Sequence, residues 1–252
     1  MRLQLSTWPE VEDYLEDSTG IIIPIGSTEQ HGPTGFIGTD AICPELLAFE
    51  IGARLNVMVG PTLSIGMAQH HLGFAGSVTL RPTTLISVVC DVVNSLTRHG
   101  FDRFFFLNGH GGNIPTVQAA FSEVYAQRSL GPTGSNHPAV RCVLENWWRI
   151  PAVQQIAEKE FGDGEGSHAT ASEVALTYYG YPEDGARVRQ DELTPRIAPQ
   201  GPIHDADDYR RRFADGRIGS DPTLATPEIG KMLFEAAVRD LGRAYEEFTA
   251  AL

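Results

Sequence analysis

Apolar stretches typical of strands alternate along this chain with stretches that have the spacing of helices. Continuous hydrophobic runs, as expected of strands covered on both faces of a sheet, predict strands at 21–25, 57–59, 103–107 and 140–144, and a shorter run predicts one at 77–80. Helical spacing, caps and Gly or Pro boundaries predict helices near 40–55, 82–99, 114–128, 152–161, 171–179 and 227–250.

The order of these elements predicts an α/β fold. Strands followed by helices with short connections form βαβ units, which place the strands in a mostly parallel sheet. A chain of 252 residues without a break in composition is expected to form one domain, 1–252. Residues 181–225 differ, because Pro, Asp, Arg and Gly dominate there with little periodicity. We expect this segment to be an irregular lid, or an arm that packs on another subunit.

Composition narrows the classes of partner. The chain has 19 basic and 32 acidic residues, and its net charge of −13 would repel a nucleic-acid backbone and an anionic membrane surface. The one tight basic cluster, 210–212, follows Asp205, Asp207 and Asp208 and has the pattern of a solvated surface run. No apolar stretch approaches the roughly 18 residues of a membrane span, and the first residues lack the apolar core of a signal peptide. We expect a cytoplasmic protein without nucleic-acid or membrane partners.

The three cysteines fit a reducing compartment. Cys43, Cys90 and Cys142 are odd in number, far apart, and each in an apolar run. Buried free thiols are the simplest interpretation, and no disulfide framework is implied.

Short polar islands after the predicted strands carry the candidate chemistry. They are Glu29-Gln30-His31, Asp40, the Asn-Gly-His-Gly-Gly-Asn loop at 108–113, and His168 with Glu173. Open α/β sheets keep their sites at the carboxyl ends of their strands. Three carboxylates with two or three imidazoles and no cysteine form a ligand set suited to a hydrolytic metal such as Zn, Mn or Fe(II).

The spacing of Glu29, His31 and Asp40 favours a shared site. Side chains at i and i+2 of an extended backbone point the same way, so Glu29 and His31 can face one point beyond the first strand. Asp40, at the start of the next helix, can return to that point, and its carboxylate can bridge two metals. The structural alternative is that Asp40 only caps the helix and Glu29 is a solvated loop residue.

Glycines surround His110 in the loop at 108–113. They let the backbone pass close to a ligand and leave amide N–H groups open to an anion or an oxyanion. A plain tight turn is the alternative, but it needs fewer special residues.

His168 and Glu173 are five residues apart, about 140° around a helix, so they cannot share a helical face. His168 should therefore precede the helix. The run from Thr170 to Glu173 is also a capping-box pattern. Glu173 is either a metal ligand or the N3 member of a helix cap, and the pattern alone leaves both open.

Four segments together resemble the creatininase family, the creatinine amidohydrolases and their relatives. They are Gly-Ser-Thr-Glu-Gln-His-Gly-Pro at 26–33, Thr39-Asp40, the loop at 108–113, and Gly-Ser-Asp-Pro-Thr-Leu-Ala-Thr-Pro-Glu at 219–228. The resemblance runs in the same order over nearly the whole chain. It implies a single-domain α/β/α fold with helices on both sides of a mostly parallel sheet, hydrolysis of amide C–N bonds by a dinuclear metal centre, and a homo-hexamer.

The resemblance also implies roles for individual residues. Glu29 and His110 would hold one metal ion, His31 would hold the other, and Asp40 would bridge both. His168 matches the family histidine that binds substrate and can act as acid or base.

This chain departs from the family pattern at two places. Creatininase itself has a metal-binding glutamate two residues after the loop histidine, where this chain has Gly112. Relatives with His-Gly-Gly-Asn in the loop resemble this chain in having a glutamate five residues after the later histidine, here Glu173, which favours Glu173 as the replacement ligand. Ala68 and His70 replace a serine and a glutamate that often precede the family histidine matching His71, a substrate-binding candidate. Creatinine is therefore not the expected substrate.

The mechanism can be predicted from charge. Two divalent ions, zinc first with manganese or iron as alternatives, would be neutralised by the three carboxylates and a bridging hydroxide. Metal ligation lowers the pKa of water toward about 7, so the hydroxide can attack an amide carbonyl. A metal and the Gly111 and Gly112 amides would hold the oxyanion, and His168 would protonate the leaving nitrogen. Trp148 or its neighbour Trp147 is expected to wall the pocket, although core or interface roles fit these tryptophans equally well.

The sequence therefore predicts a dinuclear metal-dependent amidohydrolase that acts on a small cyclic amide, a formamide or a related molecule, at C–N bonds other than ordinary peptide bonds. Two other classes stay open. One is a metal-dependent phosphoesterase, although such sites usually carry more imidazoles and a phosphate-clamping Arg or Lys. The other is a non-catalytic binding protein that retains the fold.

Overall fold

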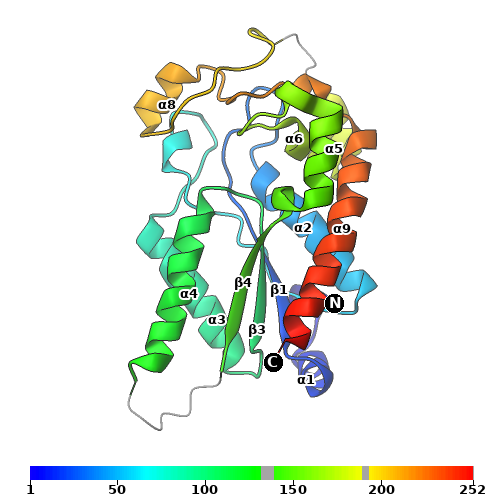
Figure 1. The fold of residues 1–252 in the computed structure, drawn as a ribbon. Helices are drawn as coiled ribbons and strands as arrows, with labels where there is room; N and C mark the ends of the chain where they lie inside the picture. Colours follow the sequence, from blue (N-terminus) through cyan, green and yellow to red (C-terminus); the bar gives the residue numbers. More distant parts are fainter. Residues whose placement is uncertain (132–138, 189–192, 252) are drawn as a thin grey trace.

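A parallel sheet forms the centre of the molecule in the computed structural model, which describes residues 1–131, 139–188 and 193–251 (Figure 1). Its strands, in the spatial order β2-β1-β3-β4, are β1 (Gly20–Ile25), β2 (Met58–Val59), β3 (Arg103–Asn108) and β4 (Arg141–Asn146). The pairing of β1 with β3 runs from Gly20 opposite Arg103 to Ile25 opposite Asn108. The two central strands therefore end level with each other, and the loops that follow them lie together.

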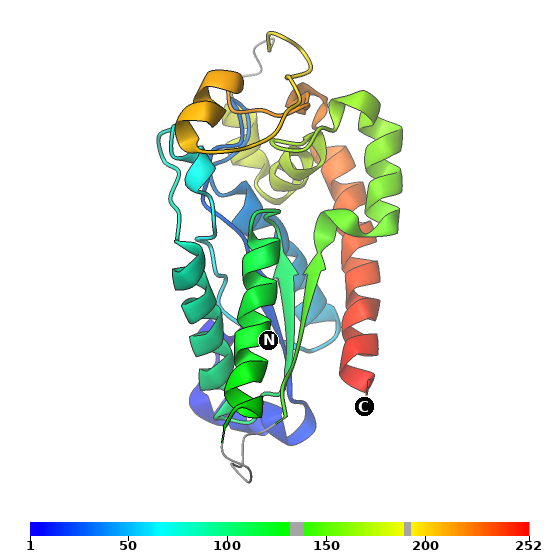
Figure 2. The same cartoon turned by 60° about the vertical axis from the view of Figure 1, so that its left-hand side comes forward.

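Helices cover both faces of this sheet (Figures 1 and 2). The helices on one face are α2 (Thr39–Arg54), α5 (Pro151–Phe161), α6 (Ala171–Gly180) and α9 (Pro227–Ala250). Those on the other are α1 (Trp8–Asp17), α3 (Pro82–Thr97) and α4 (Asn113–Ser129). Ile22 packs in the first layer while Ile21 and Ile23 pack in the second, because successive side chains of a strand point to opposite faces. The predicted α/β fold, with helices on both sides of a mostly parallel sheet, is confirmed.

Two local predictions differ from the structure. The predicted elements do not include α1, although Thr7 and Glu10 form a capping box at its start. The predicted strand at 77–80 is wrong, because among the described residues only Val78 bridges another segment there, at Thr28. Val78 is 45% exposed and Leu80 alone of this run packs against a core cluster, so burial does not hold the run in a sheet.

The segment at 181–225 is more ordered than the sequence predicts. Its described part contains α7 (Pro182–Arg187), α8 (Ala206–Arg212) and a 3-10 turn (Pro222–Leu224). Residues 189–192, which also belong to the predicted lid or arm, lie outside the described residues. Tyr209, Phe213 and Ile218 form a small buried cluster. Figure 2 shows α8, in orange, above the end of the sheet to which the strands point, so this part of the segment packs on its own chain. Packing on a second subunit stays a prediction.

All three cysteines are free thiols, as predicted. Cys43 and Cys90 are buried, whereas Cys142 is only half-buried because β4 is an edge strand. In the part of the chain that the structure describes, no helix combines the length and the apolar character needed to cross a membrane.

Candidate metal centre

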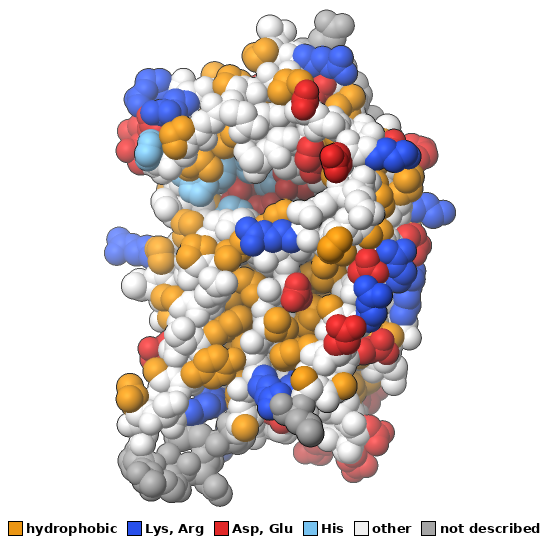
Figure 3. Space-filling model, viewed as in Figure 1, with side chains coloured by type: hydrophobic (Ala, Val, Ile, Leu, Met, Phe, Trp, Pro, Cys, Tyr) orange, Lys and Arg blue, Asp and Glu red, His pale blue; other side chains and the backbone are white. Residues whose placement is uncertain are grey.

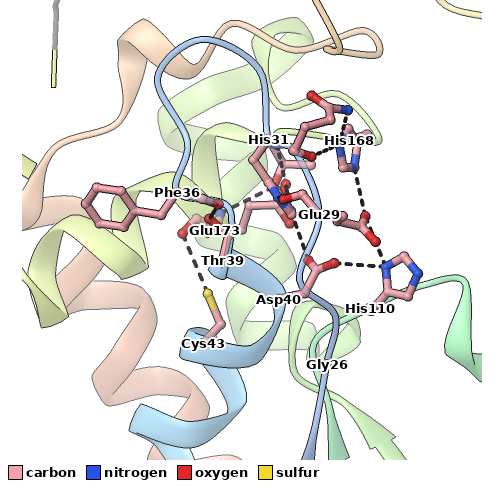
Figure 4. Close-up of polar contacts among 12 residues, drawn as sticks. Gly26, Glu29, His31, Phe36, Thr39, Asp40, Cys43, His110, His168 and Glu173 are labelled. Carbon is pink, nitrogen blue, oxygen red and sulfur yellow. Dashed lines mark hydrogen bonds and ion pairs between the residues drawn. The ribbon is translucent and has the colours of Figure 1, made fainter. Parts of the chain in front are cut away.

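The predicted ligand residues come together at the carboxyl end of the sheet (Figure 4). Glu29 and His31 lie in the loop after β1, Asp40 in the first turn of α2, His110 in the loop between β3 and α4, and Glu173 in the first turn of α6. The first four are buried, and the Glu173 side chain is 13% exposed.

Two glycines allow this convergence. A Cβ at Gly26, just after β1, or at Gly109, just after β3, would overlap the main-chain oxygen of Asp40. The start of α2 can therefore approach both strand ends only because neither carries a side chain there. Asp40 does not cap α2, whose N-cap is Gly38, and its carboxylate faces imidazoles instead. The capping interpretation of Asp40 is wrong.

Main-chain carbonyls orient the imidazoles of both candidate ligands, His31 and His110. His31 donates its Nδ1–H to the Glu29 carbonyl over 3.0 Å, and His110 donates its Nε2–H to the Met67 carbonyl over 2.9 Å. Because a carbonyl only accepts, the other nitrogen of each ring is left facing the carboxylates. Asp40 meets both of them: Oδ1 lies 3.0 Å from His31 Nε2, and Oδ2 lies 2.9 Å from His110 Nδ1.

Three of the four oxygens of the buried carboxylates Glu29 and Asp40 lack an aligned donor in the described part of the chain. Within the described residues, both oxygens of Glu29 and Oδ2 of Asp40 have no hydrogen-bond partner, a costly arrangement unless a cation compensates for it. The donor atoms form three sets, and the atoms of each set lie within 4.8 Å of one another. The first donor set is Glu29, Asp40 and His110, and the second donor set is His31, Asp40 and Glu173, so both contain Asp40. A third set, without Asp40, is Glu29, His31 and His168. Oxygen and nitrogen donors of this kind fit a divalent ion on either side of Asp40.

Mutual charge sets the protonation of these groups. Burial lowers the pKa of His31, but Asp40 and Glu173 outweigh it and raise the pKa to about 10. Burial also lowers the pKa of His110, and Glu29 and Asp40 raise it to about 9. Burial raises the pKa of Asp40, but the two imidazoles hold it well below its ordinary value. Protons on the imidazoles and a cation therefore compete to neutralise the same carboxylates.

Glu173 forms the predicted helix cap, and its position is compatible with the ligand role, which stays a prediction. Its Oε1 accepts from the Thr170 N–H over 2.6 Å, and its own N–H donates to Thr170 Oγ1 over 3.3 Å, so the capping box is formed. The same Oε1 lies 3.8 Å from His31 Nε2. Burial, opposed by His31, raises the pKa of Glu173 to about 7. One carboxylate therefore caps α6 and belongs to the second donor set.

His168 precedes α6, as predicted, and lies against the same cluster. Its Nε2–H donates to the Gln30 carbonyl over 2.8 Å, and its Nδ1 lies 3.8 Å from Glu29 Oε1. Its ring lies over that of His31 with the centroids 4.6 Å apart. Burial and the neighbouring His71 hold its pKa well below the ordinary value, which leaves Nδ1 unprotonated.

A cavity of about 830 Å³ opens beside these residues. Its wall includes Asp40, His110, His168 and Glu173. Helix α5 contributes Val153 and Ala157 to the other side. Figure 3 shows acidic and imidazole side chains, red and pale blue, gathered in a hollow on this face. The sequence did not indicate the contribution of α5, because an ordinary amphipathic helix carries no chemical motif.

The predicted substrate-binding residues divide into two groups. Gly111 and Trp148 line the cavity, whereas Trp147 is 1% exposed and packs in the core. Gly112 and His71 are not among the described lining residues. A Cβ at Gly112 would overlap the His110 ring, so this glycine makes room for that imidazole. His71 is buried behind Glu29, with its Nε2 3.0 Å from Glu29 Oε1.

Comparison with known proteins agrees with this geometry. The creatininase family model, described as creatinine amidohydrolase, matches residues 4–245. The chain is 27% identical to a creatinine amidohydrolase from Pseudomonas putida, over 96% of this chain and 94% of that protein. It is 32% identical to a mycofactocin precursor peptide peptidase from Mycolicibacterium smegmatis, over 86% and 81%, and 26% identical to a 3-dehydro-scyllo-inosose hydrolase from Thermotoga maritima, over 93% and 76%.

The fold agrees as well. A solved structure described as "Creatininase Mn" matches with a TM-score of 0.84 at 22% identity, over 99% of both chains. Because the family model matches almost the whole length of this chain, the chain belongs to the creatininase family of hydrolases. The predicted resemblance is confirmed.

Proposed function

We propose that this chain is a dinuclear metal-dependent amidohydrolase that cleaves a C–N bond of a small cyclic amide, a formamide or a related molecule. The position of Asp40 carries the proposal: each of its oxygens faces one imidazole, and both donor sets share its carboxylate. A carboxylate placed in this way is suited to bridge two ions, as hydrolytic two-metal sites require.

Glu29, Asp40 and His110 would hold one ion, and His31, Asp40 and Glu173 the other. A set of oxygen and nitrogen donors suits zinc first, while manganese or iron also fits. Bound there, two divalent ions would lower the pKa of a coordinated water toward about 7 and polarise an amide carbonyl.

The surrounding residues would prepare the substrate. His168 keeps an unprotonated Nδ1 beside Glu29, where it would accept the proton of the attacking hydroxide and pass it to the leaving nitrogen. The N–H groups of Gly111 and Gly112 donate no backbone hydrogen bond in the described part of the chain. The Gly111 N–H, on the cavity wall, would bind the developing oxyanion, and the Gly112 N–H would assist if the oxyanion reaches beyond that wall. Trp148 would form an apolar wall for the substrate.

The charge of the cavity weighs against a phosphoesterase. None of its described lining residues is Lys or Arg, whereas Glu158, Asp163 and Glu165 add negative charge to its wall. A phosphate ester would find no cationic side chain among the described lining residues to clamp it, whereas a neutral amide needs none. The named relatives act on different substrates, so membership of the family does not select the particular amide.

Metal analysis combined with a substrate panel tests this function. Protein purified without chelator should contain near two divalent ions per chain and should hydrolyse some cyclic amides or formamides, but not p-nitrophenyl phosphate. Removing the ions with a chelator should abolish hydrolysis, and supplying zinc or manganese should restore it. Protein that binds no ion under any metal supply, or that cleaves only the phosphate ester, would contradict the proposal.

A further inference from the structure

Gln30 lies between the ligand candidates Glu29 and His31, and its side-chain amide is fully engaged. Its Oε1 accepts from the Gly32 N–H over 2.8 Å, which fixes the orientation of the amide. Its Nε2 lies 2.9 Å from His71 Nδ1 and 2.9 Å from the Gly216 carbonyl. Gln30 is 4% exposed, so solvent does not supply other partners.

These contacts determine where the proton of His71 sits. An amide nitrogen only donates, so His71 Nδ1 must accept from Gln30. The ring then carries its hydrogen on Nε2, the nitrogen 3.0 Å from Glu29 Oε1. The approach is short but not aligned as a hydrogen bond, because neither oxygen of Glu29 has an aligned donor among the described residues.

His168 does not compete for the Gln30 amide. His168 Nε2 lies 3.0 Å from Gln30 Nε2 but 2.8 Å from the main-chain carbonyl oxygen of Gln30, which can only accept. The His168 Nε2–H therefore goes to the carbonyl, and the two amide hydrogens of Gln30 remain for His71 and Gly216.

His71 differs from the other imidazoles of the cluster, because it accepts a hydrogen bond where they donate one. His31, His110 and His168 each donate to a main-chain carbonyl and turn the other ring nitrogen toward the carboxylates, where it offers a lone pair whenever the ring is neutral. His71 is held by a donor and turns a hydrogen toward Glu29. It cannot serve as a ligand in this state, but its Nε2–H, 3.0 Å from Glu29 Oε1, attracts the carboxylate electrostatically and so can keep it in place without an aligned hydrogen bond.

Two residues of the segment at 181–225 contact the side-chain nitrogen of Gln30. Besides the Gly216 carbonyl, the Tyr209 hydroxyl lies 3.3 Å from Gln30 Nε2 and donates to the same carbonyl over 2.8 Å. Gly216 has φ +89°, and a Cβ there would overlap Gln30 Oε1. This backbone conformation and this close approach both require glycine.

We propose that Gln30 is a positioning residue that holds His71 as its Nε2–H tautomer, and that His71 in turn holds Glu29 as a metal ligand. The effect on metal affinity rests on the proposed function, whereas the His71 tautomer does not depend on a bound metal. Outer partners of this kind typically change metal affinity about 10–100-fold when they are lost.

Nitrogen NMR of histidine tests the inference directly. In protein labelled with ¹⁵N-histidine and treated with chelator, long-range ¹H–¹⁵N spectra at pH 7.5 should show His71, assigned by loss of its signals in His71→Gln, with hydrogen on Nε2. Gln30→Glu places an acceptor opposite Nδ1 and should move hydrogen to that nitrogen. The same variant should retain one zinc ion about 10–100-fold more weakly than the unaltered protein.

Gln69→Glu is the matched control, because it makes the same change at an exposed neighbouring position. It should alter neither the His71 signals nor zinc retention. A hydrogen on Nδ1 of His71 in the unaltered protein would overturn the inference, as would unchanged signals and zinc retention in folded Gln30→Glu. If Gln30→Glu does not fold, the tautomer in the unaltered protein decides alone. A protein with the expected tautomer but without metal binding would contradict the proposed function and leave Gln30 as the residue that orients His71.

Discussion

Glu173 Oε1 accepts the Thr170 N–H over 2.6 Å and also lies 3.8 Å from His31 Nε2. A helix cap and a metal ligand are therefore not competing descriptions of this residue. The cap fixes the carboxylate at the start of α6, and the start of α6 lies beside the second donor set.

Glu173→Gln separates the two roles. Glutamine keeps the capping box, so the free energy of unfolding should change by at most about 1 kcal/mol. The lost charge should remove the ion held with His31 and lower hydrolysis, while the ion held by Glu29 and His110 stays. Elemental analysis and thermal unfolding of the same samples would show this. Thr170→Ala is the reciprocal control, with stability lowered by about 0.5–2 kcal/mol and both ions kept; two ions in Glu173→Gln would exclude the ligand role.

Asp40→Asn should differ from Glu173→Gln in the number of ions lost. Asp40 belongs to both donor sets, so removing its charge should lower the occupancy of both ions rather than one. The comparison needs only the metal content of the two purified variants. Equal loss of a single ion in both would show that Asp40 is not shared.

Metal binding should release protons at pH 7.5. The pKa values of His31, about 10, and His110, about 9, lie above the roughly 6.5 of an exposed histidine, so both rings are protonated at this pH without metal but must be neutral as ligands. Apparent metal affinity should therefore rise with pH until about pH 9–10. Calorimetric titrations with zinc in two buffers of different ionisation enthalpy measure the release. Identical heats in both buffers would argue against the ligand roles of these imidazoles.

Two adjacent tryptophans should respond differently to substitution. Trp147 is 1% exposed in the core, so Trp147→Ala should cost about 3–5 kcal/mol of stability. Trp148 lines the cavity, so Trp148→Ala should cost less stability and raise KM for an amide substrate with both ions retained. Denaturant unfolding and steady-state kinetics distinguish the two. A Trp148→Ala protein with unchanged KM and kcat would remove Trp148 from the substrate wall.

The chain should assemble as a homo-oligomer, a hexamer by resemblance to its family, with the segment at 181–225 at or near an interface. Ile197 and Ile203 on this segment are 45% and 44% exposed, which fits surface that a neighbouring copy covers. Light scattering should give several times the 27.5 kDa of one chain. Changing both isoleucines to lysine should lower that mass, and Leu5→Lys, at another exposed apolar position, should not. A monomer would contradict this assembly.

The sequence predicted the fold because its strands are buried on both faces. A continuous apolar run such as 21–25, in a chain where helical segments follow the strands, is most simply a strand that helices cover on both faces. The strand predicted at 77–80 failed because alternation over four residues does not supply a partner strand, and Val78 finds only one bridge. Helix α1 did carry a signal, the Thr7 and Glu10 cap followed by apolar residues at helical spacing.

At the site, residue types and loop positions predicted which side chains meet, but not what orients them. The main-chain carbonyl of Met67 orients the His110 ring. Every residue has such a carbonyl, so the residue type at position 67 gives no sign of this contact. Gln30 was visible within its motif, but its partners His71 and Gly216 come from distant segments that only the fold brings together. Such contacts depend on tertiary structure and have no local signature.

Anomalous X-ray scattering from crystals grown with zinc is the most direct test of the central claim, that two ions share Asp40. We expect two anomalous peaks per chain, one beside Glu29 and His110 and one beside His31 and Glu173, with an Asp40 oxygen in contact with each. A single peak, or zinc bound away from Asp40, would contradict a dinuclear centre in this protein.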